Sequence, residues 1–173
     1  MLSVKMQDAL NAQINAELWS AYLYLSMSMD ASAKGLKGVA NWFAIQFKEE
    51  QDHAQILMNY VNARGGRVVL AAIDAVQTEW STPLAMYEKT LEHEQKVTSL
   101  INDLYNIAIE EKDHASRSML TWFVDEQVEE EENARDIIDQ LRMVDGDKFG
   151  LYMIDKELAA RTYTTPSPLA TTE

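Results

Sequence analysis

The sequence predicts an all-α protein, a bundle of four long helices with one long crossover between the second and third and a short fifth helix. Only three prolines and six glycines interrupt its 173 residues, of which 47% are apolar. Apolar residues recur at steps of three and four along four long stretches. Eighteen residues without a helical period, 65–82, separate the two pairs of stretches. The length fits one domain.

The first pair of helices is predicted at about residues 4–31 and 36–64. Ser3 is predicted as the N-cap of the first helix, and Gly65-Gly66 ends the second in the usual C-terminal way. A helix of about 28 residues is roughly 42 Å long, and 18 extended residues reach at most roughly 60 Å. The segment 65–82 can therefore cross from one end of the bundle to the other.

The second pair begins at Thr82-Pro83, an N-cap followed by proline at the first helical position. It is predicted at about residues 83–111 and 114–144, with Asp113 as the cap of the later helix. A short fifth helix follows at about 148–160. We expect one domain over residues 1–161 and a flexible tail, rich in threonine and proline, over 162–173.

The composition narrows the possible partners. The chain carries 15 basic and 28 acidic residues, a formal charge of −13, which disfavours nucleic acids and anionic membranes and suits a protein that handles cations. It has no cysteine, which excludes disulfides, iron–sulfur clusters and thiolate metal sites. With no signal peptide or membrane span visible, a cytoplasmic protein is expected.

Each of the four long helices interrupts its apolar stripe near mid-length with a glutamate. Glu50 and His53 are three residues apart, so they share one helix face, and that face is apolar. Charged groups on such a face are costly unless something compensates them, and helical bundles often use a metal ion. The two halves of the chain share these spacings. Glu17 precedes Glu50 by 33 positions and His53 by 36, and Glu94 precedes Gln127 and Glu130 by the same two distances.

Glu17 and Glu94 are 77 positions apart, whereas Trp42-Phe43 and Trp122-Phe123 are 80 positions apart. Because the two shifts differ, the repeat alone does not establish the site. A single glutamate on an apolar face is more often a snorkelling or hydrogen-bonded residue than a ligand. Four such breaks at matching depth favour a metal centre over that interpretation. Four carboxylates balance two divalent ions, and carboxylates with one imidazole suit iron or manganese.

Several residues around this centre have two interpretations. Glu49, Glu126 and Glu129 lie next to the predicted ligands and form either a third, more open cation site or part of a solvated acidic surface. Tyr24 is either a packed core residue bonded to a ligand or an electron donor, and Trp122 has the same two interpretations. The remaining histidines, His93 and His114, are expected at the surface.

The motifs together resemble those of the bacterial non-haem ferritins over residues 1 to about 160. These motifs are Asn15-Ala16-Glu17-Leu18 with Tyr24, Phe47-Lys48-Glu49-Glu50-Gln51-Asp52-His53-Ala54, Glu92-His93-Glu94, and Trp122-Phe123-Val124-Asp125-Glu126-Gln127-Val128-Glu129-Glu130. The resemblance implies the ferritin-like bundle, a twenty-four-subunit hollow shell, and a fifth helix that lines its fourfold axes.

The resemblance also implies residue roles. Glu17, Glu50 and His53 match the first iron site, and Tyr24 matches the tyrosine beside the centre. The second iron site is matched by Glu50, Glu94 and Glu130, with Gln127 close by. An additional third iron site is matched by Glu49, Glu126, Glu129 and Glu130.

The related haem-binding bacterioferritins carry Glu-x-x-His in both halves and methionine after the bridging glutamate. Here Gln127-x-x-Glu130 and Gln51 stand at those places, so no haem is expected. The leading hypothesis is iron storage coupled to oxidation of Fe²⁺ by O₂ or peroxide. Its rivals are a small-oligomer di-iron oxidase or peroxidase of the rubrerythrin type and a structural bundle without redox activity.

Overall fold

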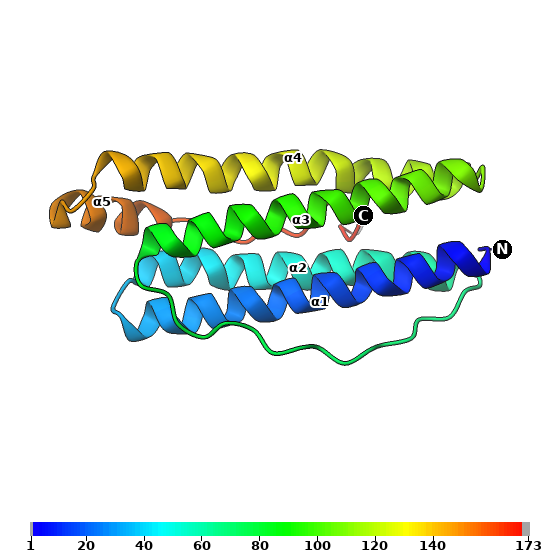
Figure 1. Ribbon diagram of the computed structural model, residues 1–173, viewed down its shortest axis with the longest axis horizontal. Coiled ribbons are helices and arrows are strands. Elements are labelled where there is room, and N and C mark those ends of the chain that lie inside the picture. Colours follow the sequence, from blue (N-terminus) through cyan, green and yellow to red (C-terminus); the bar gives the residue numbers. More distant parts are fainter. Residues whose placement is uncertain (1, 171–173) are drawn as a thin grey trace.

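The computed structural model describes residues 2–170, which form five helices and no strand. Four long helices make an elongated bundle: α1 (Val4–Ala33), α2 (Lys37–Ala63), α3 (Pro83–Glu110) and α4 (His114–Met143). α1 packs against α2 and α3 against α4 as two antiparallel pairs, and α5 (Lys148–Leu158) lies at one end (Figure 1). The predicted fold class is therefore confirmed, with helix ends displaced by at most two residues.

Side-chain caps fix where the helices begin. Ser3, Thr82 and Asp113 each accept a hydrogen bond from a backbone N–H in the first turn of α1, α3 and α4, and Asp147 does the same for α5. Such caps satisfy amide groups that have no partner within the helix. Just beyond the end of α2, Gly65 has a φ of +71°, a conformation that glycine adopts without strain.

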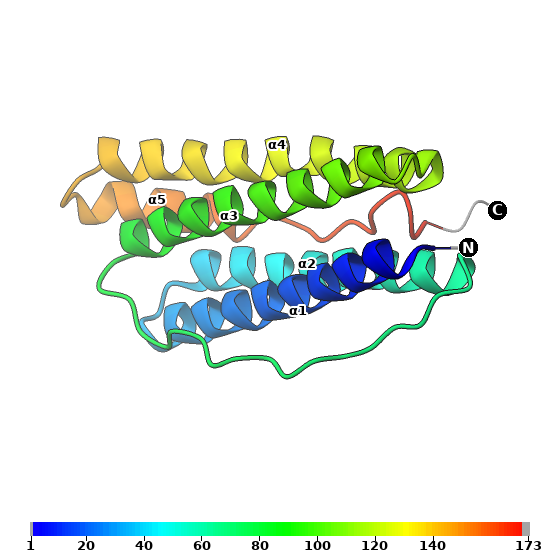
Figure 2. The ribbon, with the colours of Figure 1, turned by 45° about the vertical axis from the view of Figure 1, so that its right-hand side comes forward.

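The crossover between the helix pairs runs along α1 to the opposite end of the bundle (Figures 1 and 2). The Asn11 amide donates to the Arg67 carbonyl at 3.0 Å, and its oxygen accepts from the Val69 N–H at 2.9 Å. Trp80 is buried in the core near the start of α3. Side chains of the helices thus hold a segment that has no regular structure of its own.

The core consists of two apolar clusters, one toward each end of the bundle. Met27, Phe43 and Tyr87 belong to one cluster. Ile14 and Leu57 belong to the other. Between them lies a polar band of buried side chains from all four long helices: Glu17, Ser20, Gln46, Glu50, His53, Thr90, His93, Glu94, Gln127 and Glu130.

Helix α5 docks on the beginning of α2. The backbone N–H groups of Gly38 and Val39 donate to one carboxylate oxygen of Asp155 at 2.8 and 2.9 Å. A Cβ atom at Gly38 would lie 1.6 Å from the Asp155 carbonyl oxygen, so only glycine permits this approach. Ile154 and Leu158 are buried on the same side of α5.

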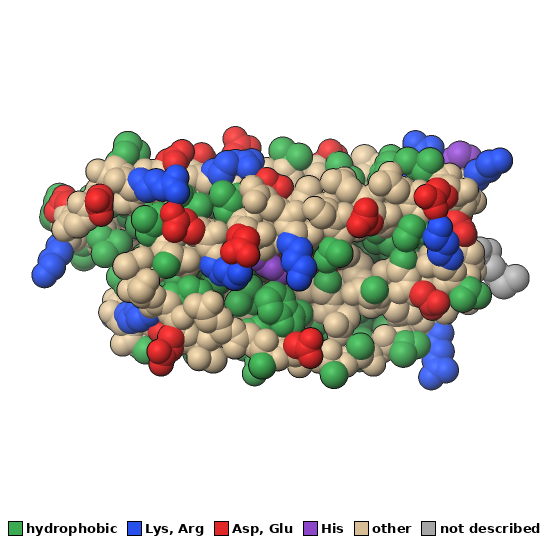
Figure 3. All heavy atoms as spheres, in the orientation of Figure 1, with side chains coloured by type: hydrophobic (Ala, Val, Ile, Leu, Met, Phe, Trp, Pro, Cys, Tyr) green, Lys and Arg blue, Asp and Glu red, His purple; other side chains and the backbone are tan. Residues whose placement is uncertain are grey.

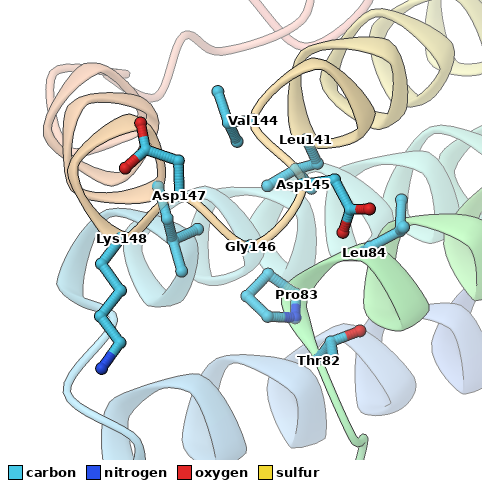
Figure 4. A pocket seen from close by; sticks show the side chains of 10 residues that line it. Thr82, Pro83, Leu84, Leu141, Val144, Asp145, Gly146, Asp147 and Lys148 are labelled. Carbon is cyan, nitrogen blue, oxygen red and sulfur yellow. The ribbon is translucent and has the colours of Figure 1, made fainter.

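On the face of the molecule in Figure 3, acidic and basic side chains are interspersed with apolar ones. A pocket of about 320 Å³ lies at the end of the bundle, between the start of α3 at Thr82 and Pro83 and the turn of Gly146 and Asp147 into α5 (Figure 4). None of the predicted ligands lines it. No helix among residues 2–170 is long and apolar enough to cross a membrane.

Candidate metal centre

Three buried side chains meet in the polar band. Glu17 comes from α1, and Glu50 and His53 come from successive turns of α2; one ligand atom of each lies within 4.8 Å of the other two. Their exposed fractions are 1%, 2% and 2%, and His53 Nδ1 lies 3.5 Å from Glu50 Oε2. Two carboxylates and an imidazole are a donor set that suits divalent transition metals.

Two further carboxylates reach the same band from the second helix pair. Glu94 of α3 and Glu130 of α4 are both buried. The Tyr24 hydroxyl donates to one oxygen of Glu94, and the Gln127 amide donates to the other at 3.1 Å. The Gln46 amide donates to Glu130 at 2.8 Å. Neutral hydrogen-bond donors therefore hold both carboxylates in place.

Gln13 and Gln46 also belong to this network, although the sequence patterns did not predict them as site residues. The Gln13 amide donates to Glu17 at 2.8 Å, and Gln46 contacts Glu130 across the bundle. Each glutamine stands four positions before a predicted ligand, Glu17 or Glu50, and therefore on the same helix face. A glutamine one helical turn before a predicted ligand, on the same apolar stripe, is the sequence signal that could have identified them.

The electrostatics of the band favour a bound cation. Burial raises the pKa of Glu50 well above its usual value, and the negative charges of Glu94 and Glu17 raise it further. Burial, reinforced by the charge of Glu94, raises the pKa of Glu130 to about 8. One oxygen each of Glu17 and Glu50 is buried without a hydrogen-bond partner. Buried acceptors of this kind are costly unless a proton or a metal satisfies them.

Comparison with known proteins decides the family. The sequence profile described as "Ferritin-like domain" matches residues 7–144. The chain belongs to the ferritin family. The resemblance predicted from the motifs is thereby confirmed.

Curated relatives align with this ferritin chain over nearly its whole length. The bacterial non-heme ferritin of Bacteroides fragilis strain 638R is 44% identical over 161 residues, which span 93% of this chain and 100% of the relative. The bacterial non-heme ferritin of Staphylococcus saprophyticus is 40% identical over 163 residues, which span 94% and 98%. The similarity therefore includes α5 as well as the bundle.

Solved structures give the same result. A crystal structure of an open pore ferritin from the hyperthermophilic archaeon Archaeoglobus fulgidus superposes with a TM-score of 0.93 at 48% identity, over 94% of this chain and 100% of that one. A humanized archaeal ferritin gives a TM-score of 0.94 at 48% identity, over 95% and 99%. Agreement at this level extends to the arrangement of all the helices.

The outer carboxylates Glu49, Glu126 and Glu129 lie beside the centre without forming a closed site. Glu126 is half-buried, with its Oε1 3.9 Å from His53 Nε2, whereas Glu129 is exposed. Glu49 accepts a hydrogen bond from Arg161 at 2.8 Å. Among residues 2–170, Glu17, Glu50 and His53 have the spacing of a metal site, and the outer carboxylates are not part of that group.

His93 is not at the surface, and this prediction was wrong. Its side chain is 8% exposed and lies between α1 and α3, with Nε2 2.7 Å from the Ser20 hydroxyl and its ring against Trp19. Burial lowers its pKa to about 4, and the charges of nearby lysines add to this effect, so the ring is neutral at pH 7. His114, in contrast, is exposed as predicted.

The two aromatic residues singled out in the sequence contact different predicted ligands. Tyr24 is fully buried, bonded to Glu94 and stacked near Phe43. The Trp122 ring is half-buried and meets the edge of the His53 ring, with centroids 5.5 Å apart. Both residues therefore pack directly against predicted ligands, which fits either of their interpretations.

Proposed function

We propose that this ferritin chain stores iron by oxidising Fe²⁺ at the buried centre and depositing the ferric product as a mineral. The observation that carries the proposal is the burial of one carboxylate from each of the four long helices, with one imidazole, in the polar band between two apolar clusters, where Glu17, Glu50 and His53 have metal-binding spacing. Four carboxylates balance two Fe²⁺ ions. Leucine would serve a merely structural core better.

In this reaction two Fe²⁺ ions each lose one electron. The electron pair and two protons reduce O₂ to hydrogen peroxide, or reduce hydrogen peroxide to two molecules of water. The protein positions the ions and offsets their charge. The residues proposed for the first ion are Glu17, Glu50 and His53, and those for the second are Glu50, Glu94 and Glu130 beside Gln127.

The charge balance also explains release. Two Fe³⁺ ions bring six positive charges to a site with four carboxylates, so the product fits less well than the substrate. We propose a third iron position outside the centre, at Glu49, Glu126 and Glu129 with Glu130. These carboxylates lead from the buried centre toward solvent: Glu130 is buried, Glu126 is half-buried and Glu129 is exposed.

The mineral needs an enclosed space, so we propose that twenty-four copies of this chain form a hollow shell in the cytoplasm. The relatives that align over nearly the whole chain, α5 included, are ferritins. Light scattering on the assembled protein should give a mass near twenty-four times that of the 19.7 kDa chain. A dimer would contradict the shell and would favour the rubrerythrin-type alternative.

Aerobic addition of Fe²⁺ to the metal-free protein tests the chemistry. Wild type should show rapid growth of ferric absorbance, and the Glu17→Ala/His53→Ala variant should lose the fast phase. The matched control, Glu132→Ala/His114→Ala, removes an exposed glutamate and histidine from α4 and should keep the fast phase. No ferric absorbance in wild type, or an intact fast phase in the first variant, would contradict the proposal.

A further inference from the structure

The chain after α5 returns along the bundle instead of leaving it. Residues 161–170 run between the α1/α2 pair and the α3/α4 pair (Figures 1 and 2). The Asn41 amide donates to the Arg161 carbonyl at 3.0 Å, and the Tyr163 hydroxyl donates to Asp52 at 2.5 Å. Leu169 packs against the more distant apolar cluster. This segment therefore covers the side of α2 that carries Glu49.

The Arg161 side chain lies against α2 beside Glu49 and Trp42. Its Nη2 donates to Glu49 Oε2 at 2.8 Å, its Nη1 donates to the Trp42 carbonyl at 3.3 Å, and its guanidinium lies 4.8 Å from the centre of the Trp42 ring. The two side chains of the ion pair are only 24% and 20% exposed. The guanidinium is thus fixed by three contacts with α2, unlike a freely moving surface cation.

Glu49 belongs to the same electrostatic environment as the outer carboxylates. Burial raises the pKa of Glu126, and the charges of Glu129 and Glu49 raise it further. Burial likewise raises the pKa of Glu49, whereas the positive charge of Arg161 opposes this effect. The carboxylates therefore repel one another across the outer position, and Arg161 supplies a positive charge there.

We infer that Arg161 is a tethered counter-ion that occupies the outer iron position and must leave Glu49 before a third iron ion can bind there. The inference rests on the proposed function, because it concerns the outer position described above. A guanidinium does not lose its charge at accessible pH. An arriving Fe²⁺ ion must therefore compete for Glu49 Oε2 and also overcome repulsion from Arg161.

This competition orders the filling of the sites. Glu17 and Glu50 each have a buried oxygen without a hydrogen-bond partner, so iron can take these two oxygens without breaking an ion pair of the kind that Arg161 makes with Glu49. The outer position accepts iron only at the expense of the contact between Arg161 and Glu49. The tail thereby keeps the third iron weaker than the first two and allows the inner centre to fill first.

Anaerobic calorimetric titration of the full-length, metal-free protein with Fe²⁺ tests the inference. In Arg161→Met the third ion should bind about tenfold more tightly, which corresponds to about 1.4 kcal/mol. Arg161→Lys keeps the charge and should stay within about threefold of wild type. Arg135→Met is the matched control, because Arg135 pairs with Glu131 on its own helix at 2.9 Å, away from Glu49.

Two further variants separate a counter-ion from a structural clamp. Asn41→Ala loosens the backbone of Arg161 without removing its charge, and it should tighten the third ion about threefold even if Arg161→Met fails to assemble. In a Glu49→Gln background, Arg161→Met should have no further effect on the third ion. A purely structural role would instead change the melting temperature without this dependence on Glu49.

The outcomes distinguish the two proposals. If Glu49→Gln leaves the third ion unchanged, the outer position in the proposed function is wrong. If Glu49→Gln weakens the third ion but neither Arg161→Met nor Asn41→Ala tightens it, the counter-ion inference is wrong. Binding that is unchanged or weaker in Arg161→Met than in Arg135→Met would overturn it as well.

Discussion

Replacing Glu50 with glutamine should stabilise the metal-free protein and at the same time weaken iron binding. Glu50 is 2% exposed, one of its oxygens has no hydrogen-bond partner, and its ligand oxygen shares a small space with those of Glu17 and His53. Glutamine has almost the same volume and carries no charge. Its amide can also donate to Glu17, whose second oxygen lacks a partner.

The size of the effect follows from what the carboxylate lacks. A buried acceptor left unsatisfied costs about 1–3 kcal/mol. Because the new amide can donate to the unpaired oxygen of Glu17, the substitution should raise the free energy of unfolding of the metal-free protein by about 2 kcal/mol. For a domain of this length, 1 kcal/mol shifts the melting temperature by about 2–4 °C. We therefore expect an increase of about 4–8 °C at neutral pH.

The pH dependence has a definite sign. Burial and the charges of Glu94 and Glu17 raise the pKa of Glu50 well above its usual value. The folded wild type then holds a proton that the unfolded chain loses, so its stability falls as pH rises above the usual glutamate value of about 4.5. Glutamine does not titrate. The advantage of the variant should therefore grow from about pH 5 to about pH 8.

Melting curves of metal-free wild type and Glu50→Gln across this pH range provide the test, with exposed Glu132→Gln as the control. Anaerobic titration with Fe²⁺ should show the opposite order, with binding to the inner centre weakened at least tenfold in Glu50→Gln. A variant that melts below wild type at pH 8, or that binds iron as tightly as wild type, would refute the argument that Glu50 is held for iron and against stability.

Three other predictions concern the surroundings of the centre. Gln46→Leu removes the amide that holds Glu130 and should weaken the second iron about tenfold in the same titration, whereas exposed Gln55→Leu should not. Gly38→Ala places a methyl group against the backbone of α5 and should lower the free energy of unfolding by about 3 kcal/mol in urea titration. Burial raises the pKa of Asp113, but its hydrogen bonds outweigh this effect, so the pKa is lowered overall. The difference in free energy of unfolding between wild type and Asp113→Asn should therefore be fully present at pH 7 and should disappear as the pH falls below about 4.

The helices could be predicted because their signals are local. Apolar steps of three and four, the caps at Ser3 and Thr82, and Gly65 each act within a few residues, so they can be recognised without the rest of the fold. The hydrogen bonds that fix the crossover against α1 could not be predicted. They depend on Asn11 meeting backbone groups at Arg67 and Val69, and no pattern within the crossover itself indicates that contact.

The same distinction applies to the site. Glu17, Glu50 and His53 break an apolar periodicity, so a pattern within each helix marks them, and the structure brings them together. The burial of His93 was missed because it depends on how closely α1 approaches α3. The pair of Arg161 and Glu49 joins residues 112 positions apart. Sequence spacing contains no information on such a contact until the path of the tail is known.

The position of the polar band at mid-length has a physical consequence for the ligands. Apolar clusters pack on both sides of it, so every helix that carries a proposed ligand is held above and below the site. Glu50 and Glu94 therefore cannot separate to relieve their repulsion, as carboxylates near a frayed helix end would. The energy of apolar packing keeps these acceptors together, and the proposed pair of iron ions would relieve their mutual repulsion on binding.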